Sequence, residues 1–162
     1  MVADPSFSED GLGEVHVFER TPSGAWFRSA LLRPWDGGNG TGFGSALGVQ
    51  GGFAYIGAGT ADGNYGAVYI FRHDGARWVP YQKIRGQGAV LGAQFGISLA
   101  VDGDRLVVGA NRDGGNGGQA GAIYVFERDA AGTWLQRRDS SRMTARLATC
   151  SVRAWTSRGT PS

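Results

Sequence analysis

The sequence contains one cysteine and five prolines among its 162 residues, and its charges nearly balance. The single Cys150 provides neither a disulfide framework nor a cluster of thiolates for a metal. The net charge is only +2 and the basic residues are scattered, so we set nucleic acid aside as a partner. No apolar run approaches the roughly 20 residues of a membrane-spanning helix. The first residues printed lack the basic and then apolar pattern of a signal peptide.

Glycine, in contrast, is abundant, with 29 residues, far above the average of about 7 %. The glycines follow no Gly-X-Y period, which excludes collagen. They lie between short apolar runs, as in β-proteins that are rich in turns. The length is sufficient for one domain with a hydrophobic core.

One stretch of the sequence occurs twice. FGSALGVQGGFAYIGAG begins at Phe43, and FGISLAVDGDRLVVGAN begins at Phe95, 52 positions later, with no gap in the alignment. Each copy continues through a Gly-rich loop into AVYIFR at Ala67 or AIYVFER at Ala122, and then into a segment that contains tryptophan. GEVHVFER near the N-terminus repeats the second half of this unit. A long fixed period of this kind indicates a repeat architecture.

Each full unit holds four short candidate strands, which in the second copy are ISLAV, RLVVGA, AIYVFE and TWLQR. Tight turns are predicted at residues 102–104 and 129–132. The middle strands are apolar at consecutive positions, so both faces of the sheet must be covered. No segment has helical periodicity, which leaves further copies of the sheet as the cover and predicts a β-propeller. The side chains expected to be buried are Leu106, Val108, Ile123 and Val125.

The pattern FG…VVGA…GAIYVFER resembles the FG-GAP repeat, which occurs in the propeller head of integrin α-subunits and in many bacterial surface proteins. The resemblance covers residues 2–134. One difference is that the proline of the Gly-Ala-Pro part of the motif is missing, since the copies read Gly57-Ala58-Gly59 and Gly109-Ala110-Asn111. The predicted fold is all-β, a partial β-propeller built from four-stranded FG-GAP blades, with an irregular C-terminal tail.

The repeat divides the chain into four parts. We expect residues 1–36 to be the second half of a truncated blade, residues 37–84 and 85–139 to be full blades, and residues 140–162 to be an irregular basic tail. The nucleotides that encode Met143-Thr144 and Trp155-Thr156 each contain an aspartate codon in a shifted frame, and suitable codons between them restore another repeat. We therefore expect the tail to be frameshifted and the chain to be a piece of a longer gene product.

The repeated motif implies structural roles for its residues. Phe43 and Phe95 are expected to wedge between adjacent blades, and the glycines after them to allow close backbone approach near the crowded axis. Gly-Ala pairs are expected to let a strand end pass close to its neighbour. Trp26, Trp78 and Trp134 mark one position of the repeat, which packing explains better than ligand stacking. The motif residues are Phe43, Gly44, Gly57, Ala58, Phe95, Gly96, Gly109 and Ala110.

The Gly-rich loops contain weak candidates for calcium ligands, namely Asp62, Asn64, Asp113 and Asn116. Some members of the family bind calcium in such loops, in a pattern resembling Asp-x-Asp-x-Asp-Gly. Neither loop supplies that pattern, and calcium needs about 6–8 oxygen ligands. We therefore expect these residues to form turns, and we predict no metal site and no cofactor.

The sequence does not contain a recognisable catalytic constellation. His16 occupies the position of Tyr69 and Tyr124 in the other copies, so we expect a partly buried strand residue. His73 follows a strand, and we expect it to be exposed. No serine lies in a nucleophile elbow. These observations predict that the chain is not an enzyme.

The resemblance implies a non-catalytic binding module, a fragment of a propeller from a surface or secreted protein that recognises protein or glycan through its loops. Two alternatives stay open: an accessory propeller of a larger extracellular enzyme, and a non-functional product of a disrupted reading frame. We expect the terminal blades to expose apolar faces, which would favour self-association and weaken the isolated chain.

Overall fold

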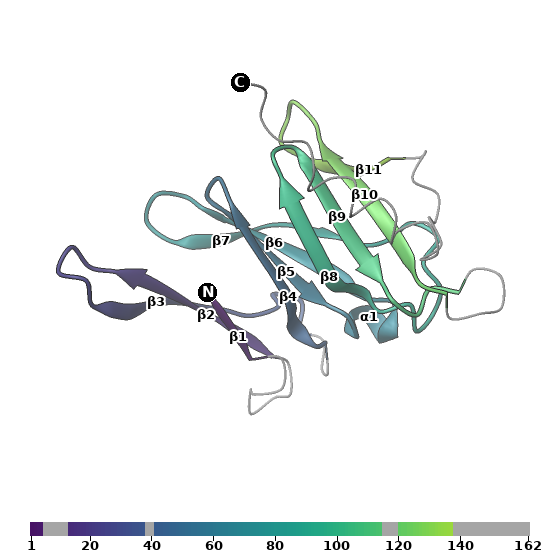
Figure 1. Ribbon diagram of the computed structural model, residues 1–162, viewed down its shortest axis with the longest axis horizontal. Coiled ribbons are helices and arrows are strands. Elements are labelled where there is room, and N and C mark those ends of the chain that lie inside the picture. The colour runs from purple at the N-terminus through teal and green to yellow at the C-terminus, as the bar shows by residue number, and fades with distance from the viewer. Residues whose placement is uncertain (5–12, 38–40, 115–119, 138–162) are drawn as a thin grey trace, which may run out of the picture.

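The computed structural model describes residues 1–4, 13–37, 41–114 and 120–137, and the predicted tail lies outside these ranges. Three antiparallel sheets follow one another along the chain, and adjacent sheets pack face to face (Figure 1). We call them the first, central and third sheets. The first sheet contains β1 (Val2–Asp4), β2 (Glu14–Arg20) and β3 (Trp26–Leu32). The central sheet contains β4 (Phe43–Gln50), β5 (Phe53–Ala58), β6 (Ala67–His73) and β7 (Trp78–Ile84). The third sheet contains β8 (Phe95–Asp102), β9 (Arg105–Ala110), β10 (Ala122–Arg128) and β11 (Trp134–Gln136).

Within each sheet every strand pairs with the next strand of the chain. The central and third sheets have four strands each, which confirms the predicted all-β fold built from four-stranded blades. The one helical element in the described ranges is α1 (Ala61–Asn64), a single turn interrupted by left-handed backbone at Asp62 and Gly63. The repeat therefore folds as a series of antiparallel meanders.

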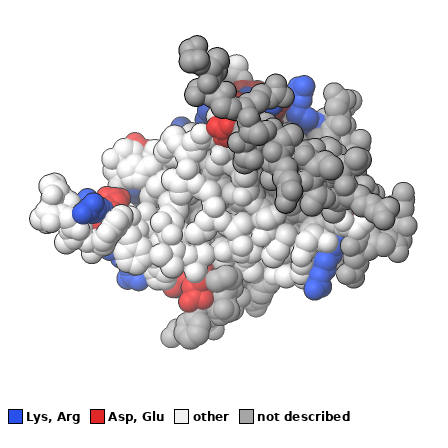
Figure 2. Space-filling view, in the orientation of Figure 1, with Lys and Arg blue, Asp and Glu red and all other residues white. Residues whose placement is uncertain are grey.

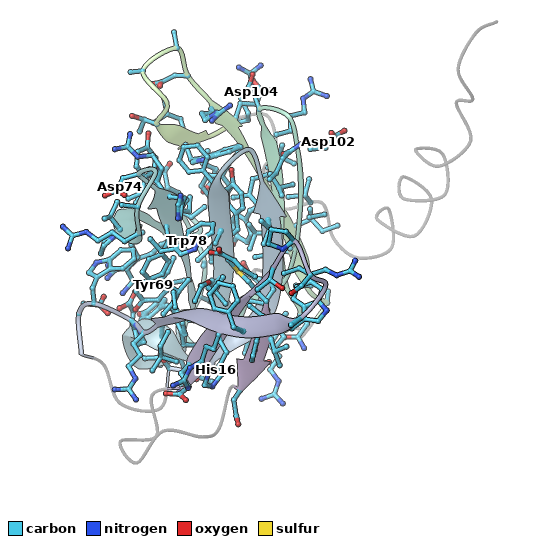
Figure 3. The ribbon with its side chains drawn as sticks, turned by 90° about the vertical axis from the view of Figure 1, so that its left-hand side faces the viewer. His16, Tyr69, Asp74, Trp78, Asp102 and Asp104 are labelled. Carbon is cyan, nitrogen blue, oxygen red and sulfur yellow. The ribbon has the colours of Figure 1, made fainter. Side chains whose placement is uncertain are left out.

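Because the strands alternate in direction, the connections fall on two opposite rims. The short-turn rim carries the tight hairpins, such as Gly51-Gly52, where both residues have positive φ (+57° and +77°). The predicted turn before Arg105 is also a hairpin, since Asp102 pairs with Arg105. The long-connection rim carries the β5–β6 and β9–β10 loops and the segments that join one sheet to the next. Figure 3 shows Asp74 and Asp104, both in turns of the short-turn rim, at the same end of the molecule.

Two hydrophobic cores fill the spaces between adjacent sheets. Strands β5 and β6 of the central sheet bury runs of consecutive side chains, because each face of that sheet meets a neighbouring sheet. Each large apolar side chain that is fully buried contributes about 1.5–3 kcal/mol. The core between the first and central sheets contains Val15, Val17, Leu32, Phe43, Ile56, Tyr69 and Phe71. The core between the central and third sheets contains Tyr55, Val68, Ile70, Phe95, Leu106, Val108, Tyr124, Phe126 and Trp134.

The outer sheets bury mainly one face. In β9, Leu106 and Val108 are fully buried as predicted, whereas Val107 between them is 37 % exposed. The expectation that Ile123 and Val125 are buried is wrong, since both are only partly buried. They lie on the face of the third sheet that points away from the central sheet, as their register with β9 shows.

The repeated tryptophan packs against the sheet that precedes its own. Trp134 is 2 % exposed, and its ring lies 5.6 Å from the ring of Tyr55 in the central sheet. Trp78 is partly buried against the core shared with the first sheet. Trp26 is 67 % exposed, because no described sheet precedes the first one. Burial of this residue therefore depends on a preceding neighbour.

The Phe-Gly motif lies where adjacent sheets approach most closely. Phe43 and Phe95 are both fully buried, each within one of the two cores. A Cβ atom on Gly96 would lie 2.3 Å from the carbonyl oxygen of Ala67 in the central sheet. A Cβ atom on Gly57 would lie 1.9 Å from the carbonyl oxygen of Gly96. Backbone meets backbone here, and only glycine fits.

Candidate functional site

A cleft opens on the long-connection rim between the α1 turn and the segment that joins β7 to β8. Its volume is about 310 Å³, and it is lined by Asp62, Tyr65, Gly66, Arg85, Gly86 and Ala89. Tyr65 is 44 % exposed, and the side chain of Arg85 is 62 % exposed. The cleft therefore presents an aromatic ring and a guanidinium group to solvent.

Backbone hydrogen bonds hold the two walls of this cleft together. The amide of Gly92 donates to the carbonyl of Asn64 at 3.0 Å, and the amide of Phe95 donates to the carbonyl of Tyr65 at 3.1 Å. Asp62 and Asn64 adopt positive φ (56° and 73°), which reverses the chain within α1. Aspartate and asparagine tolerate this conformation better than most residues. The tight turn thus places Tyr65 beside the β7–β8 segment.

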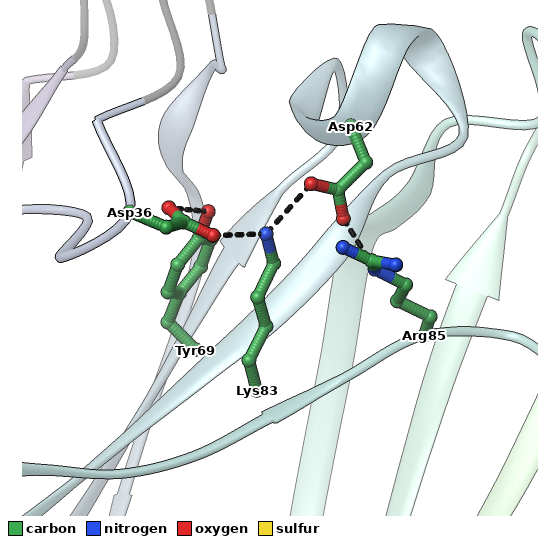
Figure 4. A network of polar contacts seen from close by, with 5 residues as sticks. All are labelled: Asp36, Asp62, Tyr69, Lys83 and Arg85. Atoms are coloured by element: carbon green, nitrogen blue, oxygen red, sulfur yellow. Dashed lines mark hydrogen bonds and ion pairs between the residues drawn. The ribbon is translucent and has the colours of Figure 1, made fainter.

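A network of charged groups includes Asp62 and Arg85 of the cleft (Figure 4). Lys83 on β7 donates through Nζ to Asp62 at 2.7 Å and also to Asp36, which lies in the segment between β3 and β4. The hydroxyl of Tyr69 donates to Asp36 at 2.7 Å, and Arg85 pairs with Asp62 at 2.5 Å. One lysine therefore ties the segment before β4 to the α1 turn.

The ionisation of this network follows from burial and its internal hydrogen bonds. Burial raises the pKa of Tyr69 to about 12, although Lys83 beside the hydroxyl acts in the opposite direction. Burial also acts to raise the pKa of Asp36 and to lower that of Lys83. Hydrogen bonds outweigh burial in both, so the pKa of Asp36 is lowered and that of Lys83 is raised. At neutral pH the network therefore holds a carboxylate, an ammonium and a neutral phenol.

The structure places the predicted calcium candidates in separate surroundings. Asp62 is engaged by Lys83 and Arg85, while Asp113 is buried and accepts a hydrogen bond from Tyr124. Asn64 forms part of the α1 turn, and Asn116 lies outside the described residues. Among the described ranges, no three histidine, cysteine or acidic residues gather as a metal site would require. That this chain binds no calcium stays a prediction.

Both histidines make contacts within the fold. His16 Nε2 lies 3.0 Å from Glu14, and its Nδ1 lies 3.3 Å from a nitrogen of Arg28. His73 packs edge-on against Trp78, with ring centroids 5.2 Å apart, and is partly buried rather than exposed. We expected an exposed side chain for His73, and the nearby tryptophan is the reason for the difference.

Among the described residues on the face seen in Figure 2, charged side chains do not gather into a patch of one sign. Acidic and basic residues lie around its margin, and the middle of the face is uncharged. This distribution agrees with the net charge of +2.

Lys83 is expected to contribute to stability because two carboxylates converge on it. Its side chain is 13 % exposed. The substitution Lys83→Met keeps most of the aliphatic stem but leaves Asp36 and Asp62 without their shared cation. We expect a loss of about 1–3 kcal/mol in the free energy of unfolding, measured by urea denaturation.

The matched control is Arg77→Met on the short-turn rim. Arg77 is 81 % exposed and pairs with Asp74 at 3.8 Å, so its substitution should change stability by no more than about 0.5 kcal/mol. Equal losses for the two variants would show that Lys83 contributes no more than a surface ion pair.

The contribution of Asp36 should depend on pH. Its folded pKa lies below the ordinary value of 3.8, so the stabilisation is fully present above that value and is lost as the pH falls through the folded pKa. The difference in free energy of unfolding between the wild type and Asp36→Asn should therefore be constant near neutral pH and shrink in acid. Urea titrations at several pH values measure it, and a difference that stays constant throughout the acid range would contradict this assignment.

The meander sheets, the cores between them and the shared Phe-Gly motif define a repeat protein built of propeller-type blades. Residues 78–126 match the family model of the FG-GAP repeat. The chain therefore contains an FG-GAP repeat over these residues. A search of curated proteins gave no match.

The match runs from β7 into β10 and so crosses from the central sheet into the third. FG-GAP repeats are typical of extracellular or surface proteins and are typically non-catalytic. In the part of the chain that the structure describes, no helix is long and apolar enough to cross a membrane.

Proposed function

We propose that this chain is a non-catalytic binding module that recognises a protein or glycan through its long-connection rim, as part of a surface or secreted protein. The observation that carries the proposal is the cleft, which combines the exposed ring of Tyr65 with the guanidinium of Arg85. Tyrosine and arginine are enriched at recognition surfaces because each offers a large contact area and directional hydrogen bonds. The FG-GAP match supports an interaction role.

The rigidity of the cleft also favours binding. Lys83 and Arg85 hold Asp62 in place, and backbone hydrogen bonds fix both walls. A site that is already ordered loses less conformational entropy when a ligand binds. Arg85 directly follows the last residue of β7, and Figure 4 shows its guanidinium beside Asp62.

The experiment uses a glycan array of neutral and acidic oligosaccharides together with an array of random peptides. We expect the wild type to bind members of one array, and Tyr65→Ala and Arg85→Gln each to weaken that binding by about tenfold or more. Arg77→Gln, on the opposite rim, is the control and should bind like the wild type. Failure to bind either array, or binding that both cleft variants retain, would overturn the proposal.

A further inference from the structure

The first and third sheets each have an outward face with large apolar side chains. Strand register places Val2, Phe18, Trp26 and Leu31 on the side of the first sheet that points away from the central sheet. They are 58, 38, 67 and 39 % exposed, respectively. We call this set the leading face. Figure 3 shows the molecule from this side, with His16, another residue of the face, on the near strands.

The opposite end of the chain presents a complementary surface. The side of the third sheet that points away from the central sheet carries Val107, Ile123 and Leu135. Val107 is 37 % exposed, Leu135 is 53 % exposed, and Ile123 is partly buried. We call this set the trailing face.

Within the chain, a leading face already packs against a trailing face at two places, the two cores between adjacent sheets. The central sheet turns Tyr69, Phe71 and Trp78 toward Val15 and Val17 of the first sheet. The third sheet turns Tyr124, Phe126 and Trp134 toward Val68 and Ile70 of the central sheet in the same way. In both contacts an aromatic leading side packs on branched aliphatic side chains of the trailing side, which Tyr55 joins in the second contact.

The leading face of the first sheet repeats this arrangement position by position. His16 stands where Tyr69 stands in the next unit, Phe18 corresponds to Phe71, and Trp26 corresponds to Trp78. No described sheet covers these side chains, and their exposure sets them apart from their buried counterparts. Four large apolar side chains on one face of a sheet are more than isolated surface residues would explain.

We propose that the leading face of one copy of this chain docks on the trailing face of a second copy, continuing the stacking of sheets from one molecule into the next. A second copy is the occupant because both kinds of face are exposed among the described residues, and because each kind already packs on the other within the chain. The contact is heterologous, so that each copy uses two different surfaces.

The internal contacts also predict the register of the docked pair. Within the chain, the ring of Trp134 lies 5.6 Å from that of Tyr55. Trp26 occupies the tryptophan position of the first sheet, and Val107 occupies the Tyr55 position of the third sheet. Trp26 of one copy should therefore lie against Val107 of the other.

Sedimentation velocity of the full chain tests this proposal, with the variants Trp26→Glu and Val107→Glu. We expect the wild type to associate as its concentration rises and each variant alone to associate at least about tenfold more weakly. An equal mixture of the two variants should associate again, now only as a dimer, because the intact leading face of Val107→Glu fits the intact trailing face of Trp26→Glu. Recovery on mixing also shows that both variants are folded.

Leu91→Glu is the matched control, since Leu91 is 66 % exposed but lies on the β7–β8 segment, outside both faces. It should associate like the wild type. A wild type that is monomeric at every concentration overturns the proposal, as does association that either single variant retains. A mixture that does not recover dimers overturns it as well. None of these outcomes depends on the cleft at Tyr65, so the proposed ligand-binding function is tested separately.

Discussion

Replacing Gly96 by alanine should lower the free energy of unfolding by about 3–5 kcal/mol. Gly96 has a φ of +94°, and an added Cβ atom would lie 2.3 Å from the carbonyl oxygen of Ala67. The backbone of the central sheet cannot retreat without opening the core behind it, so the two sheets would have to separate locally. Urea denaturation followed by tryptophan fluorescence measures the loss.

Gly75→Ala is the control that separates the steric clash between the sheets from the cost of placing alanine at a positive φ. Gly75 has a similar φ of +103°, but no atom lies within 4 Å of the position of its Cβ. Its substitution should cost only the left-handed conformation, about 1–2 kcal/mol. Losses of the same size at Gly75 and Gly96 would show that the close approach of the sheets contributes nothing.

Phe95→Ala should destabilise the chain by about 3–5 kcal/mol, the usual range for removing a buried phenylalanine ring. Phe95 is fully buried, and its ring centroid lies 5.2 Å from that of Tyr124 and 5.9 Å from that of Phe126. The truncation leaves a cavity between the central and third sheets that their strands cannot collapse to fill.

Leu91→Ala is the control for this truncation. Leu91 lies on the β7–β8 segment, four residues before Phe95, and is 66 % exposed, so its substitution should change the free energy of unfolding by no more than about 0.5 kcal/mol. Thermal or urea denaturation of both variants gives the comparison. A small loss for Phe95→Ala would show that the wedge between the sheets is not a packing element.

The sheets were predictable because the signal is local. Consecutive apolar residues, such as those from Ile123 to Phe126, do not suit a surface strand, and their recurrence with the same turns indicated stacked sheets. The extent of burial was not predictable. Val125 and Ile70 occupy equivalent positions of the repeat, yet Ile70 is fully buried and Val125 is not. The difference depends on whether a neighbouring sheet covers the strand, which the strand's own sequence does not encode.

The charged network of the cleft was missed for a related reason. Asp36 belongs to a Gly-rich stretch that predicts only a turn, and Lys83 lies 47 positions further along the chain. Nothing in either segment indicates the other, because their contact arises from the packing of β7 against the segment before β4. The only available signal was the lysine within the strand WVPYQKI, and its partners could be identified only from the folded structure.

The alternation between short turns and long connections has a consequence for how such a chain can change over evolution. The β5–β6 connection spans residues 59–66, whereas the β9–β10 connection spans the longer stretch 111–121. The strands on either side keep the same pairing, Ala58 with Ala67 and Ala110 with Ala122. Insertions on the long-connection rim are thus absorbed without shifting a single residue of the sheets. Selection can therefore lengthen and diversify that rim while the Phe-Gly contacts between sheets are inherited unchanged.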